Sequence, residues 1–182
     1  MKTSVKIAEK LKDRSAFTIA ETLIAIIILM LVSTLVAAGI PSARRAYEGV
    51  VKAADAELLL STTISTLRNE LSTAKDINIE SNTIKYYNGA TGAYSKISKN
   101  TGDSGKGEIQ YQKFATEEGL SEEASAVVPL ITQQASTEDL YVTYGSAVYA
   151  DGIVTFSDIY VRDNSKKDVT GQDEIKIRII SY

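Results

Sequence analysis

Apolar residues dominate the chain from residue 17 to residue 40, and Glu21 is the only charged residue among them. As a helix rising about 1.5 Å per residue, this segment would be about 36 Å long, enough to cross a hydrocarbon core of about 30 Å. Its uncharged polar residues Thr18, Thr22, Ser33 and Thr34 carry hydroxyls that can bond back to the helix backbone. Residues 17–40 are therefore predicted to form a transmembrane helix.

Residues 41–76 are predicted to continue this helix as an amphipathic half. Apolar residues recur there at near-helical spacing, at Tyr47, Val50, Ala54, Leu58, Leu60, Ile64, Leu67, Leu71 and Ala74. Most charged residues fall on other faces. We favour a core-facing stripe, and a coiled-coil seam is the alternative. Polar residues from Asp76 onward predict that the helix ends near Ala74 or Lys75.

Gly39 and Pro41 interrupt the helical pattern at the predicted membrane boundary. Proline lacks a backbone N–H, and its ring pushes the preceding turn away. We therefore expect a kink or a locally melted turn at these two residues.

From about residue 77 the pattern becomes alternating, which predicts a β-rich head over residues 77–182. Strands are expected at 77–79, 83–87, 108–114, 140–144, 153–156 continuing through 159–161, and 174–180. Turns are expected at Asn88–Gly89, Gly92, 102–107, Asp151–Gly152 and Asp163–Asn164. Residues 117–128 read as a short helix ended by Pro129. The predicted fold class is α+β, a long N-terminal helix packed against an antiparallel sheet.

Glu21 needs an explanation in an apolar segment. An ionised side chain in a bilayer costs roughly 2.5–3.5 kcal/mol on insertion scales, so an intramembrane carboxylate indicates a function and requires a partner. A cut between Ala16 and Phe17 would create a cationic α-amino group one helical turn from Glu21, on the same side of the helix. Glu21 could then pair with that amine in its own chain or in a neighbouring one.

Residues Ala16 to Leu23, with a basic leader before them and the apolar run after them, resemble the type IV prepilin signal. In that family a membrane peptidase removes the leader, the new N-terminal residue is usually an N-methylated Phe, and a Glu at the fifth mature position guides assembly. The resemblance implies a leader over residues 1–16, cleavage after Ala16, methylation of Phe17 and an assembly role for Glu21. The family usually has Gly where this chain has Ala16. The resemblance covers roughly residues 10–45.

The same resemblance implies a pilin-like fold and a structural subunit of a type IV pilus or a secretion pseudopilus. The implied partners are the prepilin peptidase, other pilin subunits and the inner-membrane assembly machinery. The implied location is the cytoplasmic membrane before assembly, and an extracellular filament or the cell surface afterwards. A pilus, a secretion pseudopilus and a DNA-uptake filament all stay open, as does a major or a minor subunit.

Composition fits one exported, non-catalytic domain. The 182 residues suffice for one core once the leader and the membrane segment are set aside. The chain has no cysteine, which excludes disulfides, thiolate metal sites and a lipoprotein anchor. Many pilins close their C-terminal loop with a disulfide. This chain must hold its C-terminal end by strand pairing and packing instead.

Charge is distributed unevenly along the chain. Residues 1–16 carry five cations and two acids, a net charge of +3, and the remainder carries 15 cations and 21 acids, a net charge of −6. Positive flanks stay in the cytoplasm, so the remainder is expected to be exported. An ordinary secretory signal cleaved near 36–39 is the alternative, and it leaves Glu21 unexplained.

Three motifs invite a catalytic or metal-binding interpretation. Gly102–Gly105 resembles the nucleophile loop of trypsin-like serine proteases, but the chain has no histidine to act as the base. Extended through Lys106 and Gly107, the same loop resembles a phosphate-binding loop, but Gly107 stands where a hydroxyl should bind magnesium. We therefore favour a hairpin turn. Residues 163–174 have the span of a calcium loop, but Lys167 and Asp168 break its pattern. We favour a solvated turn there, and no cofactor is expected.

DNA is the last possible partner to consider. An acidic mature chain opposes general attraction to phosphates. Lysines and tyrosines interleave locally, however, at Lys85, Lys96, Lys99, Lys106 and Lys113 and at Tyr86, Tyr87, Tyr94 and Tyr111. Such a set can bind a strand by charge and stacking, but we favour an ordinary solvated sheet face. Two other functions stay open: a signal-anchored or secreted binding domain that does not polymerise, and an exported enzyme that uses carboxylates.

Overall fold

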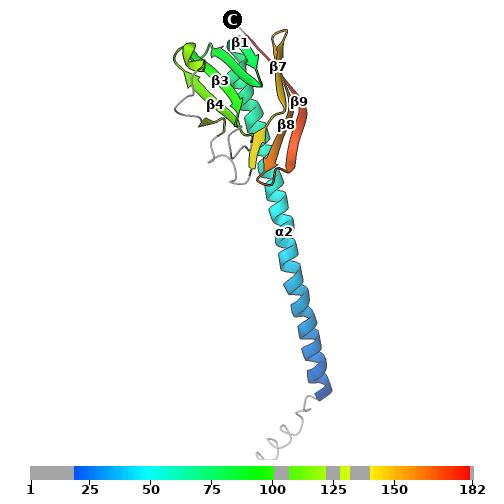
Figure 1. Cartoon of the computed structure of the whole chain (residues 1–182). Helices are drawn as coiled ribbons and strands as arrows, with labels where there is room; N and C mark the ends of the chain where they lie inside the picture. The colour runs from blue at the N-terminus through cyan, green and yellow to red at the C-terminus, as the bar shows by residue number, and fades with distance from the viewer. Residues whose placement is uncertain (1–18, 101–106, 122–127, 132–139, 181–182) are drawn as a thin grey trace, which may run out of the picture. The chain divides into compact units, whose positions relative to one another are not determined.

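The computed structural model in Figure 1 describes residues 19–100, 107–121, 128–131 and 140–180. The chain divides into two compact units, Met1–Gly49 and Val50–Tyr182. A long apolar N-terminal helix is followed by antiparallel sheets, which confirms the α+β layout.

Helix α2 (Ile19–Ser72) supplies all the described structure of the first unit. Every residue from 19 to 49 is exposed. By length and composition, α2 contains one segment that is long and apolar enough to cross a membrane. Three hydroxyl groups in this segment donate to backbone carbonyls one turn earlier, as predicted: Thr22 to Ile19, Ser33 to Leu29, and Thr34 to Leu31.

The backbone is helical without a break through Gly39 and Pro41. The locally melted turn that we expected there is therefore wrong, because the neighbouring residues keep helical geometry around the one donor that proline removes. The kink at these residues stays a prediction.

In the second unit, α2 packs one face against the core. Its buried residues are Ala56, Leu59, Leu60, Thr63, Leu67 and Leu71. The predicted core stripe is thus right from Leu60 onward and wrong for Tyr47, Val50, Ala54 and Leu58, which are exposed. The reason lies in the helical period: Val50, Ala54 and Leu58 follow one another at intervals of four and point away from the line of Ala56, Leu59 and Thr63.

The helix ends at Ser72, before the predicted end at Ala74 or Lys75. Strand β1 (Ala74–Glu80) begins there instead, because Ala74 and Lys75 pair with Asn88 and Tyr87 of strand β2 (Thr83–Asn88). Local helix signals do not contain this pairing, which joins segments more than ten residues apart.

The first sheet has the order β1-β2-β3-β4-β5, with β3 at Ala93–Lys99, β4 at Ile109–Phe114 and β5 at Val128–Pro129. The predicted helix over 117–128 is wrong at both of its ends, and its residues 122–127 lie outside the described residues. A 3-10 turn, η1 (Glu118–Ser121), stands near its start, and Val128 pairs with Tyr111 of β4 at its end. Pro129 therefore belongs to an edge strand, where a missing N–H is tolerated.

The second sheet is built on β8 (Ile153–Asp163), which pairs along its length with β9 (Asp168–Arg178). On its other side β8 pairs with β6 (Leu140–Thr143) at one end and with β7 (Ser146–Ala150) at the other. Asp151 and Gly152 form the predicted two-residue turn between β7 and β8, with φ angles of 52° and 73°.

Both sheets pack against the C-terminal part of α2, and residues of all three form one hydrophobic core (Figure 1). The two sheets are also joined by polar contacts. Tyr144 donates its hydroxyl to the carbonyl of Asn82, and the Lys99 ammonium donates to the carbonyls of Tyr144 at 3.1 Å and Gly145 at 2.9 Å. One charged side chain therefore bridges β3 and the β6–β7 connection.

The C-terminal end is held by backbone pairing, as the absence of cysteine predicted. Beyond β9, the N–H of Ile179 donates to Gly152 at 2.9 Å, and the N–H of Ile180 donates to Ser72 at 2.8 Å. Ser72 is the last residue of α2, so the tail satisfies one of the carbonyls that a helix end leaves without an intrahelical partner.

Candidate functional site

The predicted processing site lies at the start of the chain. Ala16 and Phe17 are outside the described residues, so cleavage and methylation stay predictions. Glu21 lies near the start of the described part of α2, which begins at Ile19. The predicted assembly residue therefore belongs to the exposed part of the helix.

The residues after Glu21 form a continuous apolar surface. Leu23 is 55% exposed, Ile28 is 57% exposed and Leu29 is 69% exposed. A folded protein rarely leaves such a surface uncovered, so it marks contact with a membrane or with other protein chains. Because its hydroxyls bond to the helix backbone, the surface presents few polar groups that need water.

The residues proposed as a calcium loop belong to a β-hairpin. Asp163 ends β8, and β9 begins at Asp168, so the turn between them occupies only residues 164–167. Glu174 pairs with Ser157, well away from Asp163 along the hairpin. The favoured turn is confirmed, and the single loop over 163–174 is wrong because β8–β9 pairing makes most of it a strand. Within the described ranges, Asp, Glu, His and Cys side chains form no group of three that could hold a metal.

Asp163 is instead an ionic anchor for this hairpin. Its carboxylate lies 2.9 Å from the Lys52 ammonium of α2 and accepts the backbone N–H groups of Ser165 and Lys167 at 2.9 and 3.0 Å. The hydrogen bond from Lys52, followed by that from Lys167, lowers the pKa of Asp163 below its ordinary value. The sequence did not single out this pair, whose members are far apart along the chain.

A second group that sequence reasoning missed surrounds Glu70 of α2. One oxygen of its carboxylate accepts hydrogen bonds from Asn88 at 2.8 Å, Tyr111 at 2.9 Å and Tyr86 at 3.4 Å. Burial, then the neighbouring Tyr111 and Glu70, raises the pKa of the Tyr86 hydroxyl. These bonds tie α2 to the inner side of the first sheet.

The interleaved lysines and tyrosines do not form one surface. Tyr86 is buried, and both it and Tyr111 bind Glu70 on the inner side of the first sheet. Strand pleating places Lys85 and Tyr87 on the opposite side of β2, where Tyr87 packs edge-on against Tyr94 with ring centroids 5.1 Å apart. Lys96 pairs with Lys85 on that outer side.

The other lysines of that set are placed differently. Lys99 bridges the two sheets. The Lys113 ammonium lies 5.4 Å from the centroid of the Tyr111 ring, and Lys106 is outside the described residues. The structure therefore leaves a smaller group on the outer side of the sheet than the nucleic-acid interpretation requires.

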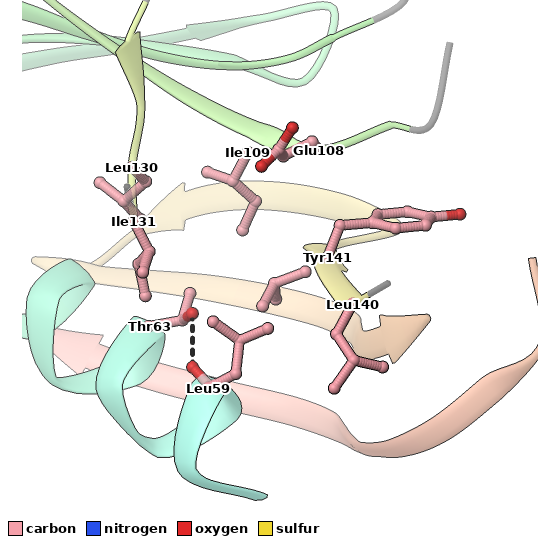
Figure 2. Close-up of a pocket in the computed structure, with 9 residues that line it drawn as sticks. Leu59, Thr63, Glu108, Ile109, Leu130, Ile131, Leu140 and Tyr141 are labelled. Atoms are coloured by element: carbon pink, nitrogen blue, oxygen red, sulfur yellow. Dashed lines mark hydrogen bonds between the residues drawn. The ribbon is translucent and has the colours of Figure 1, made fainter. Parts of the chain in front are cut away.

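The described part of the head contains a small cavity and an open groove. A cavity of about 20 Å³ lies where α2 meets β4 and β6. Figure 2 shows the residues that line it, which are Leu59, Thr63, Glu108, Ile109, Leu130, Ile131, Leu140, Tyr141 and Val142. The Thr63 hydroxyl points back to the Leu59 carbonyl at 2.7 Å. The cavity has room for about one water molecule, far less than the roughly 300–1,000 Å³ of a ligand pocket.

The other hollow is an open groove of about 330 Å³ between α2 and β9. Its titratable side chains are Glu57 and Arg68, and Glu57 accepts the Thr170 hydroxyl. This arrangement does not resemble a nucleophile with its base. The protease-like segment Gly102–Gly105 lies outside the described residues. The loop that contains it joins β3 to β4 as a hairpin, whose base is closed by Asn100 and Gly107.

Comparisons with protein-family models, with curated proteins and with solved structures find no match to this chain.

Proposed function

We propose that this chain is a structural subunit of a type IV pilus or pseudopilus, cleaved and N-methylated by prepilin peptidase and polymerised through its N-terminal helix. The observation that supports this function most is the helix itself: an uncovered apolar surface that carries Glu21 in its first turn. A simple membrane anchor does not need that carboxylate, whereas a polymerising helix uses it.

The proposed mechanism starts in the cytoplasmic membrane, where the apolar segment anchors the chain and the head is exported. The peptidase cuts after Ala16 and frees Phe17. The apolar helices then leave the bilayer and pack into a filament core, and the β-rich heads form its surface. Each chain thus exchanges contacts with lipid for contacts with other subunits.

Glu21 sets the axial register in this mechanism. Its carboxylate bonds the Phe17 amine of an adjacent subunit, because an unpaired charge is heavily penalised in a low-dielectric core. If two subunits were shifted along the filament axis, the Glu21 carboxylate and the Phe17 amine would both be buried without each other. The ion pair therefore selects one axial position. The partners are the prepilin peptidase, other pilin subunits and the inner-membrane assembly machinery.

Mass spectrometry of the mature N-terminus tests the proposal. The chain is recovered from the membrane and sheared surface fractions of its native host. A terminus at N-methylated Phe17 is the expected result. A chain that begins at Gly39, or one that is uncut, would contradict the proposal and would leave a secreted or anchored binding domain.

A further inference from the structure

The side chain of Asn88 is a buried amide at the end of β2, where the residue is only 3% exposed. Its nitrogen donates to the Glu70 carboxylate of α2 at 2.8 Å. Its oxygen accepts the backbone N–H groups of Ala90 at 3.0 Å and Thr91 at 3.1 Å. The amide is therefore held at both of its polar atoms in one orientation.

A hydroxyl group lies beside this amide. Thr73 directly follows the last residue of α2, and its Oγ1 donates to Oδ1 of Asn88 at 3.3 Å. The hydroxyl oxygen is therefore at most about 4.5 Å from the carbonyl carbon, since a C=O bond is about 1.2 Å long. Reacting atoms in a near-attack arrangement are about 3–3.5 Å apart, so a movement of about 1 Å brings the hydroxyl to the carbon.

The backbone fixes Thr73 in this place. Its carbonyl oxygen accepts the N–H of Gly89 at 3.0 Å, and the next residue, Ala74, pairs with Asn88 across β1 and β2. A Cβ atom at Gly89 would lie 3.1 Å from the same carbonyl oxygen, so the residue after Asn88 has to be small. Because the N–H of Gly89 is used in this bond, the Thr73 hydroxyl is the nucleophile that the fold presents to Asn88.

The groups around the amide have the roles that acyl transfer needs. Two backbone N–H groups about 3 Å from a carbonyl oxygen form an oxyanion hole for the charge that develops there. A threonine hydroxyl becomes a nucleophile when a base activates it. Glu70 stands three residues before Thr73 and binds the nitrogen that would leave, so it is placed to carry the hydroxyl proton to that nitrogen.

Two tyrosines hold the Glu70 carboxylate in position. Tyr111 donates at 2.9 Å and Tyr86 at 3.4 Å to the same oxygen that binds Asn88. Burial is the largest cause that raises the pKa of both hydroxyls, so both remain protonated donors at neutral pH. The tyrosines are positioning residues, and Glu70 is the group that touches the reacting amide.

We propose that Thr73 and Asn88 form an intramolecular ester bond. Oγ1 of Thr73 bonds to the side-chain carbonyl carbon of Asn88, and the C–N bond of the amide breaks. The nitrogen leaves as ammonia with the hydroxyl proton, which Glu70 transfers. The atoms balance without an oxidant, a reductant or a second substrate.

The ester would act as a covalent clasp in the head. It joins the end of α2 to the turn after β2, in a chain that has no cysteine for a disulfide. A crosslink of this kind removes conformations from the unfolded chain and so stabilises the folded one. All of its residues belong to the head unit, so the inference does not depend on the proposed function.

Peptide mapping of the full-length chain in detergent provides the first test. Trypsin cuts after lysine and arginine, so it separates Thr73 in peptide 69–75 from Asn88 in peptide 86–96. The ester should appear as one species with the mass of both peptides less one ammonia. Hydroxylamine should release the two peptides and leave a hydroxamate at Asn88. Wild-type chain that yields only the two separate peptides would overturn the inference.

Variants test the role of each group, after a cooperative thermal transition has shown that each one folds. Thr73→Val should abolish the linked species, and Thr73→Ser should keep it. Glu70→Gln should slow its appearance at least about a hundredfold, the lower end of what a general base supplies. Thr62→Val is the matched control, because that hydroxyl is exposed on α2 and donates to Leu58. A linked species in Thr73→Val would overturn the inference.

A succinimide is the other product that would lose ammonia. It forms within peptide 86–96, between the Asn88 side chain and the nitrogen of Gly89. Ammonia loss would then persist in Thr73→Val, and hydroxylamine would cut the chain between Asn88 and Gly89. That result would also overturn the inference, because the nucleophile would be the backbone and not Thr73.

Discussion

Glu21 is the residue on which the proposed assembly depends. It lies in the first turn of α2, in an otherwise uncharged part of the helix. Its role in membrane insertion is expected to be small, because one acid leaves the 22 uncharged residues 22–43 to hold the segment in the bilayer. Its role in packing is large, because neighbouring subunits would enclose it.

We therefore predict that Glu21→Ala leaves membrane insertion intact and abolishes assembly. The reason is that the substitution removes the charge that would fix one subunit against the next. Quantifying the chain in membrane and sheared fractions measures both effects. Glu21→Gln keeps the shape of the side chain and should fail in the same way. Wild-type filament levels in either variant would disprove the register hypothesis.

The second sheet leaves no space for a side chain at Gly171. It pairs with Tyr160 across the β8–β9 ladder. A Cβ atom at this position would lie 2.1 Å from Cδ1 of Tyr160 and 2.5 Å from the carbonyl oxygen of Ile159. The tyrosine ring is fixed in turn by its hydroxyl, which donates to Asp173 at 2.7 Å.

We predict that Gly171→Ala destabilises the head by about 1–3 kcal/mol, the usual cost of forcing atoms into an occupied space. Thermal unfolding of the full chain in detergent would show a lower Tm. Gly49→Ala is the matched control, since nothing lies within 4 Å of a Cβ there, and a helix favours Ala over Gly. Equal Tm values for wild type and Gly171→Ala would show that the ring moves aside freely.

At the scale of elements, the ion pair between Lys52 and Asp163 fastens the β8–β9 hairpin to α2. The Asp163 side chain is only 14% exposed, while that of Lys52 is 41% exposed. The pKa of Asp163 is lowered in the folded state, first by Lys52 and next by the N–H of Lys167. Because the pKa of Asp163 is lower in the folded chain than in the unfolded chain, its carboxylate stabilises the fold at pH values above the unfolded pKa of about 3.9. This stabilisation is lost as the pH falls through the folded pKa.

We predict that Lys52→Met lowers the free energy of unfolding at pH 7, and that its difference from wild type shrinks as the pH falls below about 4. Denaturant unfolding at several pH values measures the difference, and NMR titration should show a raised pKa for Asp163. Lys176→Met is the control, because its pair with Glu174 is exposed on both sides. A difference that stays constant down to low pH would mean that Lys52 acts through packing alone.

At the scale of the whole molecule, the chain combines a leader, an apolar segment and a β-rich head that are expected to work in sequence. In the proposed function, export would place the acidic part of the chain outside, and cleavage would then replace the basic leader by a single amine at the start of the helix. The proposed cleavage would place that amine one helical turn from Glu21.

We predict that Ala16→Leu blocks cleavage, because a bulky residue replaces the small one before the cut. The uncut chain should accumulate in the membrane and form no filament. Immunoblots of the membrane and sheared fractions measure both forms, and Ala16→Gly should be processed at least as completely as wild type. Undiminished function of the uncut variant would favour the non-polymerising surface domain.

Elements with a strong local period were predicted well from the sequence. Strands β2, β4 and β8 follow their expected ranges closely, and Asp151–Gly152 forms the expected turn. Strand β3 was missed because its inward positions are Ser95 and Ile97, so alternation of polar and apolar residues is weak. Strand β7 was missed because Ser146–Ala150 has no polar residue between apolar ones.

The sequence by itself determined that this chain has an apolar helix with one carboxylate, an amphipathic continuation and a strand-rich head, because period and charge are properties of neighbouring residues. Only the tertiary structure decided which apolar residues of α2 are covered, where the helix gives way to β1, and that Tyr86 and Tyr87 point to opposite sides. Those outcomes depend on strand register and on contacts between distant segments. Local patterns do not contain these contacts, so only the fold shows that Val50, Ala54 and Leu58 are exposed.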